Sequence, residues 1–251
     1  MSIKHKIDTA RAAVAKSDPW TSGTAQIPSH CFNLFFIDKM DPPRPHLVKL
    51  TDTTHPSELE ALSASCDQAT FGRAHEDVLD ESYRKAGKLD LGRFASTFDA
   101  AQIFPTIIPY LIQGKDAEQR VEADMHKLNV YDKGSFFRAH KDTPRSERMF
   151  GSLVVVFPTP HTGGELVLRH AEKMFTFDSG TILAGSPDKI AFIAFFSDVE
   201  HEVLPVTSGH RVTLTYNLYY PDPTSPRLSS TTAVNACILL KNLNVATSIS
   251  P

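Results

Sequence analysis

The sequence is poor in cysteine and has no long apolar run, and both deficits narrow the class of protein. Its three cysteines are odd in number and widely spaced over 251 residues, which argues against a disulfide framework and is typical of reduced thiols inside a cell. No stretch reaches the ~20 apolar residues that cross a bilayer, and the charged N-terminal segment lacks the apolar core of a secretory signal. The sequence therefore predicts a soluble, cytoplasmic protein without a membrane partner.

A surplus of positive charge is also lacking. The chain has 26 Lys and Arg against 29 Asp and Glu, a formal net charge of -3, and no cluster of basic residues. Because a nucleic-acid partner requires a basic surface, this class of partner is not expected. Hydrophobic residues make up 41% of the chain and charged residues 22%, which is ordinary for a globular protein that buries a core.

The first half of the chain predicts helices and loops rather than a continuous sheet. Its expected elements are a strand over residues 31–37 and helices over residues 56–65, 76–86 and 98–113. Ser57 stands three residues before Glu60, which resembles a capping box at a helix start. Pro105 and Pro109 interrupt the last apolar stretch, so that stretch is either one kinked helix or two short ones.

The texture of the sequence changes near residue 127, where short apolar runs begin to alternate with Gly and Pro, as in a β-sandwich or barrel. The expected strands cover residues 127–131, 135–140, 152–157, 165–169, 174–177, 181–183, 191–196, 201–206 and 212–219. A final helix is expected over residues 232–243, and no clear cap follows it before the chain stops, which is compatible with a longer C-terminus. No repeat or linker divides the chain, so one domain is expected over residues 1–251.

His140, Asp142 and His201 are the candidate metal ligands. Two imidazoles and one carboxylate are the ingredients of the facial triad that holds non-haem Fe(II) with coordination positions left open. Ten residues after the second histidine, Arg211 supplies a planar fork that can bind a carboxylate through two parallel hydrogen bonds. The pattern predicts an iron site beside a site for a dicarboxylate co-substrate.

Two other His-x-acid patterns compete with this assignment. Residues 75–77 (His-Glu-Asp) fit it, and residues 170–172 (His-Ala-Glu) are a carboxylate variant. The helix expected over residues 76–86 would place the first and third of residues 75–77 about 200° apart, too far to share a metal. His140 follows an extended run, and residues two apart on a strand lie on one face. Residues 170–172 and His161 flank a Gly-Gly turn and are expected at the surface.

Three segments around the candidate ligands carry a family resemblance. Residues 128–142 combine an apolar strand, a Tyr, a Gly turn and an aromatic before His-x-Asp; residues 162–166 contain Gly-Gly-Glu; residues 201–214 run from His through Pro-Val and Gly to Arg and a closing strand. Together they resemble the Fe(II)- and 2-oxoglutarate-dependent dioxygenases, in the prolyl 4-hydroxylase-like branch. The resemblance covers roughly residues 125 to 220.

This resemblance implies a mainly β fold with flanking helices (α+β) around a double-stranded β-helix, or jelly roll. Residues 126–220 would form the jelly-roll core, residues 1–125 would cover the barrel, and residues 221–251 would add a C-terminal loop and helix. The implied cofactors are Fe(II), 2-oxoglutarate as co-substrate, and O2. The implied products are succinate, CO2 and a substrate oxidised at an unactivated C–H bond.

The resemblance also suggests roles for residues beside the ligands. Tyr131 falls where the family places a tyrosine that helps to hold the co-substrate. Arg211 would open the last strand and point inward, and Thr213 would share its face because strand side chains alternate. The hydroxyl of Thr213 would then assist at the same carboxylate, unless the residue is an ordinary β-branched strand residue.

Two arginines are candidates for binding the substrate. Arg138 is two residues before His140 and would share its face, where it could hold a substrate carboxylate, although an arginine at a strand end often turns to solvent. Arg73 lies in a segment with a glycine and acids that looks like a lid. The same segment fits a helix N-terminus whose acids interact with the helix dipole.

Two classes of function remain open. In the first, the protein oxidises a small molecule such as a free amino acid, by hydroxylation, desaturation or ring closure. In the second, it is a peptidyl-prolyl hydroxylase that acts on a protein partner. We favour the small molecule because the sequence has no repeats, extra interaction modules or acidic peptide-binding tracts. A non-catalytic jelly-roll binding module is disfavoured, since every expected metal ligand and Arg211 are present.

Overall fold

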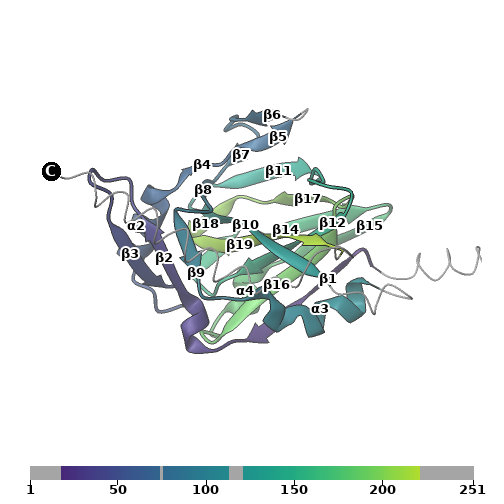
Figure 1. Ribbon diagram of the computed structural model, residues 1–251, viewed down its shortest axis with the longest axis horizontal. Coiled ribbons are helices and arrows are strands. Elements are labelled where there is room, and N and C mark those ends of the chain that lie inside the picture. The colour runs from purple at the N-terminus through teal and green to yellow at the C-terminus, as the bar shows by residue number, and fades with distance from the viewer. Residues whose placement is uncertain (1–17, 74–75, 113–120, 221–251) are drawn as a thin grey trace, which may run out of the picture.

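The computed structural model describes residues 18–73, 76–112 and 121–220, and within them two antiparallel sheets form the jelly roll (Figure 1). The larger sheet has the strand order β1 (Trp20–Gln26), β16 (Lys189–Phe196), β12 (Met149–Val156), β19 (Arg211–Tyr219), β10 (Glu122–Tyr131), β8 (Gly87–Asp90) and β4 (Asp67–Gln68). The smaller sheet has the order β15 (Lys173–Phe177), β14 (Leu166–His170), β17 (Glu200–Val203), β11 (Phe136–His140) and β7 (Arg84–Lys85). The predicted mainly β, jelly-roll fold is confirmed.

Shorter elements surround these two sheets. Three small sheets pair β13 (His161–Gly163) with β18 (Val206–Gly209), β5 (Phe71–Arg73) with β6 (Glu76–Val78), and β2 (Asn33–Ile37) with both β3 (Pro45–Lys49) and β9 (Phe94–Ser96). The helices are η1 (Ser29–Phe32), α2 (Pro56–Ser65), η2 (Ala100–Ile103), α3 (Phe104–Leu111) and α4 (Ser179–Leu183). None of the helices in the described ranges is long and apolar enough to cross a membrane.

Strand β19 divides the molecule into an apolar side and a polar side. Val212, Leu214 and Tyr216 are buried in a core that also contains apolar residues of α2, η2 and α3, as expected for helices that pack outside one sheet. The alternate side chains of the strand line a cavity: Arg211, Thr213, Thr215 and Asn217. The two-residue period of a strand produces this division.

Helix α2 has the predicted bounds, but its start is capped by a different residue. His55 Nδ1 accepts a hydrogen bond from the Ser57 backbone N–H at 3.3 Å, and Glu58 Oε2 accepts one from the His55 backbone N–H at 3.2 Å. The predicted Ser57–Glu60 box is therefore wrong. Pro56 occupies the first turn, and a proline favours extended backbone in the residue before it, so His55 becomes the N-cap.

Two predicted elements are wrong because aspartate side chains bond to nearby backbone N–H groups. Residues 76–86 form β6, a turn and β7 instead of a helix, and Asp80 Oδ1 accepts from the Ser82 backbone N–H at 2.9 Å within that turn. Residues 181–183 belong to helix α4 instead of a strand, since Asp178 Oδ1 accepts from the Thr181 backbone N–H at 3.0 Å.

The other predicted elements hold with small changes. The strand expected over residues 201–206 is divided at Leu204–Pro205 into β17 and β18, and the apolar stretch from residue 98 forms η2 and α3. Cys31 and Cys66 are buried free thiols. The helix predicted over residues 232–243 and the third cysteine, Cys237, lie outside the described residues.

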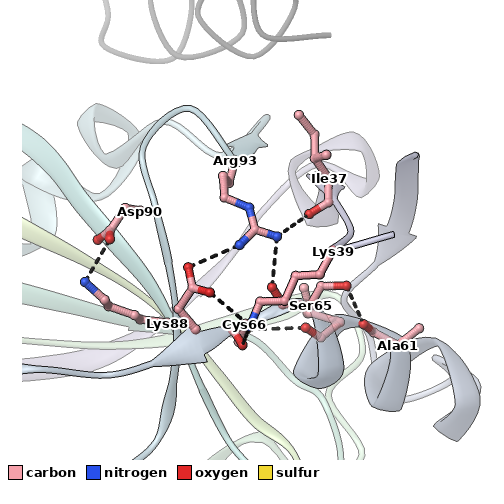
Figure 2. Close-up of polar contacts among 10 residues, drawn as sticks. Ile37, Lys39, Ala61, Ser65, Cys66, Lys88, Asp90 and Arg93 are labelled. Carbon is pink, nitrogen blue, oxygen red and sulfur yellow. Dashed lines mark hydrogen bonds and ion pairs between the residues drawn. The ribbon is translucent and has the colours of Figure 1, made fainter. Parts of the chain in front are cut away.

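A polar cluster ties the N-terminal elements to the edge of the larger sheet (Figure 2). The Arg93 guanidinium donates to Asp67 at 3.1 Å and to the carbonyl oxygens of Ile37 and Ser65 at 2.8 and 3.0 Å. Lys39 pairs with the same carboxylate at 2.9 Å. Burial alone would raise the pKa of Asp67, but the two cations lower it.

Candidate metal and co-substrate site

A cavity of about 560 Å³ opens between the two sheets, and its walls carry most of the predicted site residues. The larger sheet contributes polar side chains from β10, β12 and β19, and the smaller sheet contributes side chains from β11, β17 and β7. His140, Asp142, His201, Arg211, Tyr131 and Thr213 all line this one cavity. The structure therefore brings together the candidate metal ligands and the candidate co-substrate residues.

His140, Asp142 and His201 converge on a single point. His140 ends β11 and stands directly opposite His201 of β17 in the antiparallel register, and Asp142 follows two residues later. One ligand atom from each of the three residues lies within 4.8 Å of the other two. The His201 Nε2 and Asp142 Oδ1 atoms are 3.8 Å apart. This spacing suits three ligands on one face of a metal ion.

Hydrogen bonds on the far side of each ligand orient it toward that point. With the proton on Nδ1, His140 donates to the Arg138 carbonyl at 2.8 Å and His201 donates to the Val199 carbonyl at 3.1 Å, which leaves both Nε2 lone pairs free. Asp142 Oδ2 accepts from the Ser152 hydroxyl at 2.5 Å. Metal-binding histidines and carboxylates are commonly fixed in this way.

The electrostatic environment holds His140 and Asp142 in the protonation states that a metal requires. Burial, and then the neighbouring His201, lowers the pKa of His140 to about 3, so its imidazole is neutral near pH 7. Burial alone would raise the pKa of Asp142, but His201, the Ser152 hydrogen bond and His140 lower it below its ordinary value. Neutral imidazoles and an ionised carboxylate are the forms that coordinate a divalent cation.

Arg211 opens β19 and lies opposite Tyr131 of β10. Its side chain is only 1% exposed, its Nε donates to the Ser179 hydroxyl at 3.4 Å, and its Nη2 has no hydrogen-bond partner among the described residues. A buried donor without a partner costs free energy, and a ligand carboxylate would satisfy it. The guanidinium thus fits the distal carboxylate of 2-oxoglutarate.

The Gly-Gly turn makes room for this arginine. Gly164 has φ +74°, and a Cβ at that position would lie 2.7 Å from Val206 and 3.0 Å from the Arg211 Cδ. Ser179 is positioned in turn by His161, whose Nε2 lies 3.1 Å from the hydroxyl. His161 is buried, so its predicted surface position is wrong; helix α4 covers it.

The two predicted substrate arginines are not part of the described cavity wall. Arg138 is exposed, and its Nε donates to the Ser82 carbonyl at 2.6 Å. The register between β11 and β17 shifts by one residue between Phe137 and His140. Phe137 therefore shares the inner face with His140, and Arg138 does not. Arg73 ends β5, and its side chain lies outside the described residues.

The argument that excluded residues 75–77 as a metal site depended on a helix that is not there, and His75 lies outside the described residues. The sequence reading also missed Arg84, Lys127 and Asn129, which line the cavity. Lys127 and Asn129 alternate with apolar residues of β10, a pattern that could have placed them beside Tyr131. Arg84 was hidden by the same misassigned helix.

Comparison with known proteins agrees with this geometry. Residues 126–219 match the family model of the 2OG-Fe(II) oxygenase superfamily. The match includes the three candidate ligands and Arg211, and it agrees with the resemblance recognised in the sequence. A search of curated proteins found no match.

Three solved structures are similar to this chain at low sequence identity. A Pseudomonas putida prolyl-4-hydroxylase is 18% identical, with 84% of this chain and 97% of that chain covered and a TM-score of 0.45. A prolyl hydroxylase from Trichoplax adhaerens, in complex with a peptide fragment of the hypoxia inducible factor oxygen degradation domain, is 14% identical, with coverages of 88% and 94% and a TM-score of 0.48. A 2OG-Fe(II) oxygenase family oxidoreductase from Burkholderia pseudomallei is 20% identical, with coverages of 68% and 81% and a TM-score of 0.36.

Proposed function

We propose that the chain is an Fe(II)- and 2-oxoglutarate-dependent oxygenase that oxidises an unactivated C–H bond of a small molecule. One observation carries the proposal. Three oriented metal ligands and a buried guanidinium with an unsatisfied N–H line the same cavity. The first arrangement suits Fe(II), and the second suits the far end of a dicarboxylate co-substrate.

His140, Asp142 and His201 would hold the iron, and the cofactors would supply oxidative decarboxylation to succinate and CO2 coupled to C–H oxidation. The protein's task is to hold these residues and to keep water away. Phe137 stacks on the His140 ring at a centroid distance of 3.5 Å, and Phe195 lies 4.6 Å from the His201 ring. These contacts restrict both imidazoles and make the metal side of the cavity apolar.

Tyr131 and Thr213 would complete the co-substrate site around Arg211. The Arg211 guanidinium carbon lies 5.5 Å from the centre of the Tyr131 ring, on the facing strand. Thr213 is buried and is the next cavity-facing residue of β19 after Arg211. Tyr131 would form a wall beside the co-substrate carboxylate, and Thr213 would provide a hydroxyl that can donate to it.

The size of the cavity favours a small substrate. A volume of about 560 Å³ lies within the range of roughly 300–1,000 Å³ that is typical of small-molecule sites. A free amino acid is the leading candidate class, and hydroxylation, desaturation and ring closure would all begin with removal of one hydrogen from carbon. A peptidyl-prolyl hydroxylase acting on a protein partner is the competing function.

The test is succinate release by the purified protein with Fe(II), 2-oxoglutarate and O2. One arm contains free amino acids, and the other contains proline peptides with blocked termini. Stimulation in the amino-acid arm supports the proposal, and stimulation confined to the peptides supports the protein substrate. If the protein neither binds Fe(II) nor releases succinate in either arm, the oxygenase function itself is wrong.

A further inference from the structure

Besides Arg211, the cavity is lined by two cations that are buried or half-buried, Arg84 and Lys127, and by two that are exposed, Lys141 and Arg145. Arg84 is only 5% exposed, and its guanidinium donates to neutral oxygens, the Thr70 carbonyl at 2.6 Å and Asn129 Oδ1 at 2.8 Å. Its Nε is buried and has no hydrogen-bond partner in the described part of the chain. Lys127 is half-buried, and burial, followed by Arg84 and Lys88, lowers its pKa to about 8.

These two cations lie close together around one amide. Lys127 and Asn129 are two residues apart on β10 and line the same wall, so their Cα atoms are about 7 Å apart. Arg84 reaches the same amide from β7 through its 2.8 Å hydrogen bond. The Arg84 guanidinium is also close enough to Lys127 to lower the pKa of its ammonium group.

The pair is also close to the metal ligands. The Arg84 guanidinium carbon is 4.3 Å from the centre of the Phe137 ring, and the His140 ring stacks on Phe137 at 3.5 Å. Because the Arg84 guanidinium and the His140 ring both lie near the centre of the Phe137 ring, they must occupy opposite faces of that ring. One aromatic ring therefore separates this positive wall from the metal ligand.

Asp90, opposite Lys127 on β8, and Asp142 both interact electrostatically with Lys127, but within the described residues neither forms an ion pair with Lys127 or Arg84. Asp142 is a candidate metal ligand and already accepts from Ser152. Asp80 is exposed, and its Oδ1 accepts from the backbone N–H and the hydroxyl of Ser82 at 2.9 and 2.6 Å. A buried cation without a partner is costly, and an anionic ligand removes that cost.

We propose that Arg84 and Lys127, with Asn129 on the same wall, form a second carboxylate subsite that binds the primary substrate. The substrate is then a small carboxylic acid, with free amino acids included, and the oxidised carbon lies a few bonds from its carboxylate. This inference rests on the proposed function and identifies the substrate class for that site. It assigns the substrate carboxylate to these residues instead of Arg138, which is exposed and does not line the cavity.

The test compares acids with their primary amides as stimulators of succinate release, in the wild type and in Lys127→Met and Arg84→Gln. The acids should stimulate and the amides should not. Each variant should raise the KM for the acid by roughly tenfold or more while the KM for 2-oxoglutarate stays within about twofold. Lys127→Met keeps the test informative if Arg84→Gln, which removes a buried side chain, does not fold.

Lys173→Met is the matched control, because Lys173 lies on β15, pairs with Asp18 at 2.8 Å and does not line the cavity. It should leave both KM values unchanged. The subsite is overturned if acid and amide stimulate equally, if no acid stimulates a protein that binds Fe(II) and 2-oxoglutarate normally, or if Lys127→Met raises the KM for 2-oxoglutarate instead. If the wild type does not form a complex with Fe(II) and 2-oxoglutarate, both the proposed function and the subsite are wrong.

Discussion

Arg211 and Arg84 are both buried guanidinium groups that line one cavity, yet different parts of the chain hold them. Arg211 opens a long central strand and contacts Ser179, within the segment that matches the family model. Arg84 lies on the two-residue strand β7, outside that segment, and reaches across to Asn129. The difference indicates that the proposed co-substrate end of the cavity is built from the segment that matches the family model, whereas the proposed substrate end depends also on the N-terminal part.

The largest effect on activity is expected from the candidate metal ligands, which lie between the Arg211 end and the Arg84 end of the cavity. His140→Ala removes a metal ligand that is needed for both 2-oxoglutarate decarboxylation and substrate oxidation. Loss of only a hydrogen bond that orients such a ligand typically costs about 10–100-fold in metal affinity. We therefore expect Fe(II) affinity to fall by more than about 100-fold and succinate release to be lost. Equilibrium dialysis with Fe(II) under anaerobic conditions measures this.

The control for the metal is His170→Ala, because His170 forms a surface pair with Asp198 at 3.0 Å and should have no effect. His75→Ala tests the competing pattern directly. If His140→Ala retained full Fe(II) binding while His75→Ala lost it, the ligand assignment would be wrong.

The next largest effect should separate the two ends of the cavity. Arg211→Ala removes the buried partner of the co-substrate carboxylate, and loss of one member of such a pair typically costs about 2–5 kcal/mol. The KM for 2-oxoglutarate should rise by about 30-fold or more, with Fe(II) affinity unchanged. Arg138→Ala, which removes an exposed arginine outside the cavity wall, should change neither. An unaltered KM for 2-oxoglutarate in Arg211→Ala would refute this role.

A smaller effect tests how Arg211 is positioned. With its proton on Nδ1, His161 accepts from the Ser179 hydroxyl, and that hydroxyl accepts from the Arg211 Nε. Ser179→Ala leaves a buried donor unsatisfied, which costs about 1 kcal/mol or more. We expect about a fivefold rise in the KM for 2-oxoglutarate, little change in kcat, and recovery in Ser179→Thr. A fall in kcat alone would show that Ser179 does not position this arginine.

The smallest effect is a pH dependence at the other end of the cavity. Lys127 has a pKa of about 8 because burial, Arg84, Lys88 and Arg145 favour its neutral form more than Asp90 opposes it. Its charge is present below that pH and is lost as the pH rises. The KM for an acidic substrate should therefore increase above about pH 8 in the wild type, and this increase should vanish in Lys127→Met. A parallel increase in both proteins would assign the titration to another group.

The sequence was sufficient to predict the residues at the Arg211 end of the cavity and insufficient to predict those at the Arg84 end. The grouping of His140, Asp142, His201 and Arg211 around one cavity could be predicted from their types and spacing, and the strand period placed Arg211 on the inner face. Arg138 failed because a one-residue bulge in β11 reverses which side chains face inward, and nothing in the local composition indicates that bulge.

Arg84 was missed for a related reason. The charged segment around it has the spacing of an amphipathic helix, but a turn bonded through Asp80 and the pairing of Arg84 with Phe137 on β11 make it a strand. Pairing between distant strands overrides local propensity. Residues whose position depends on such pairing could be found only from the fold.

Anaerobic titration of the Fe(II)-loaded protein with 2-oxoglutarate tests the division of the cavity most directly, because the visible absorption of the resulting chelate reports co-substrate binding without any substrate. The wild type should develop this absorption, Arg211→Ala should require at least about 30-fold more 2-oxoglutarate, and Lys127→Met should match the wild type within about twofold. Equal weakening in both variants would contradict the account, since the two ends of the cavity would then bind the same molecule.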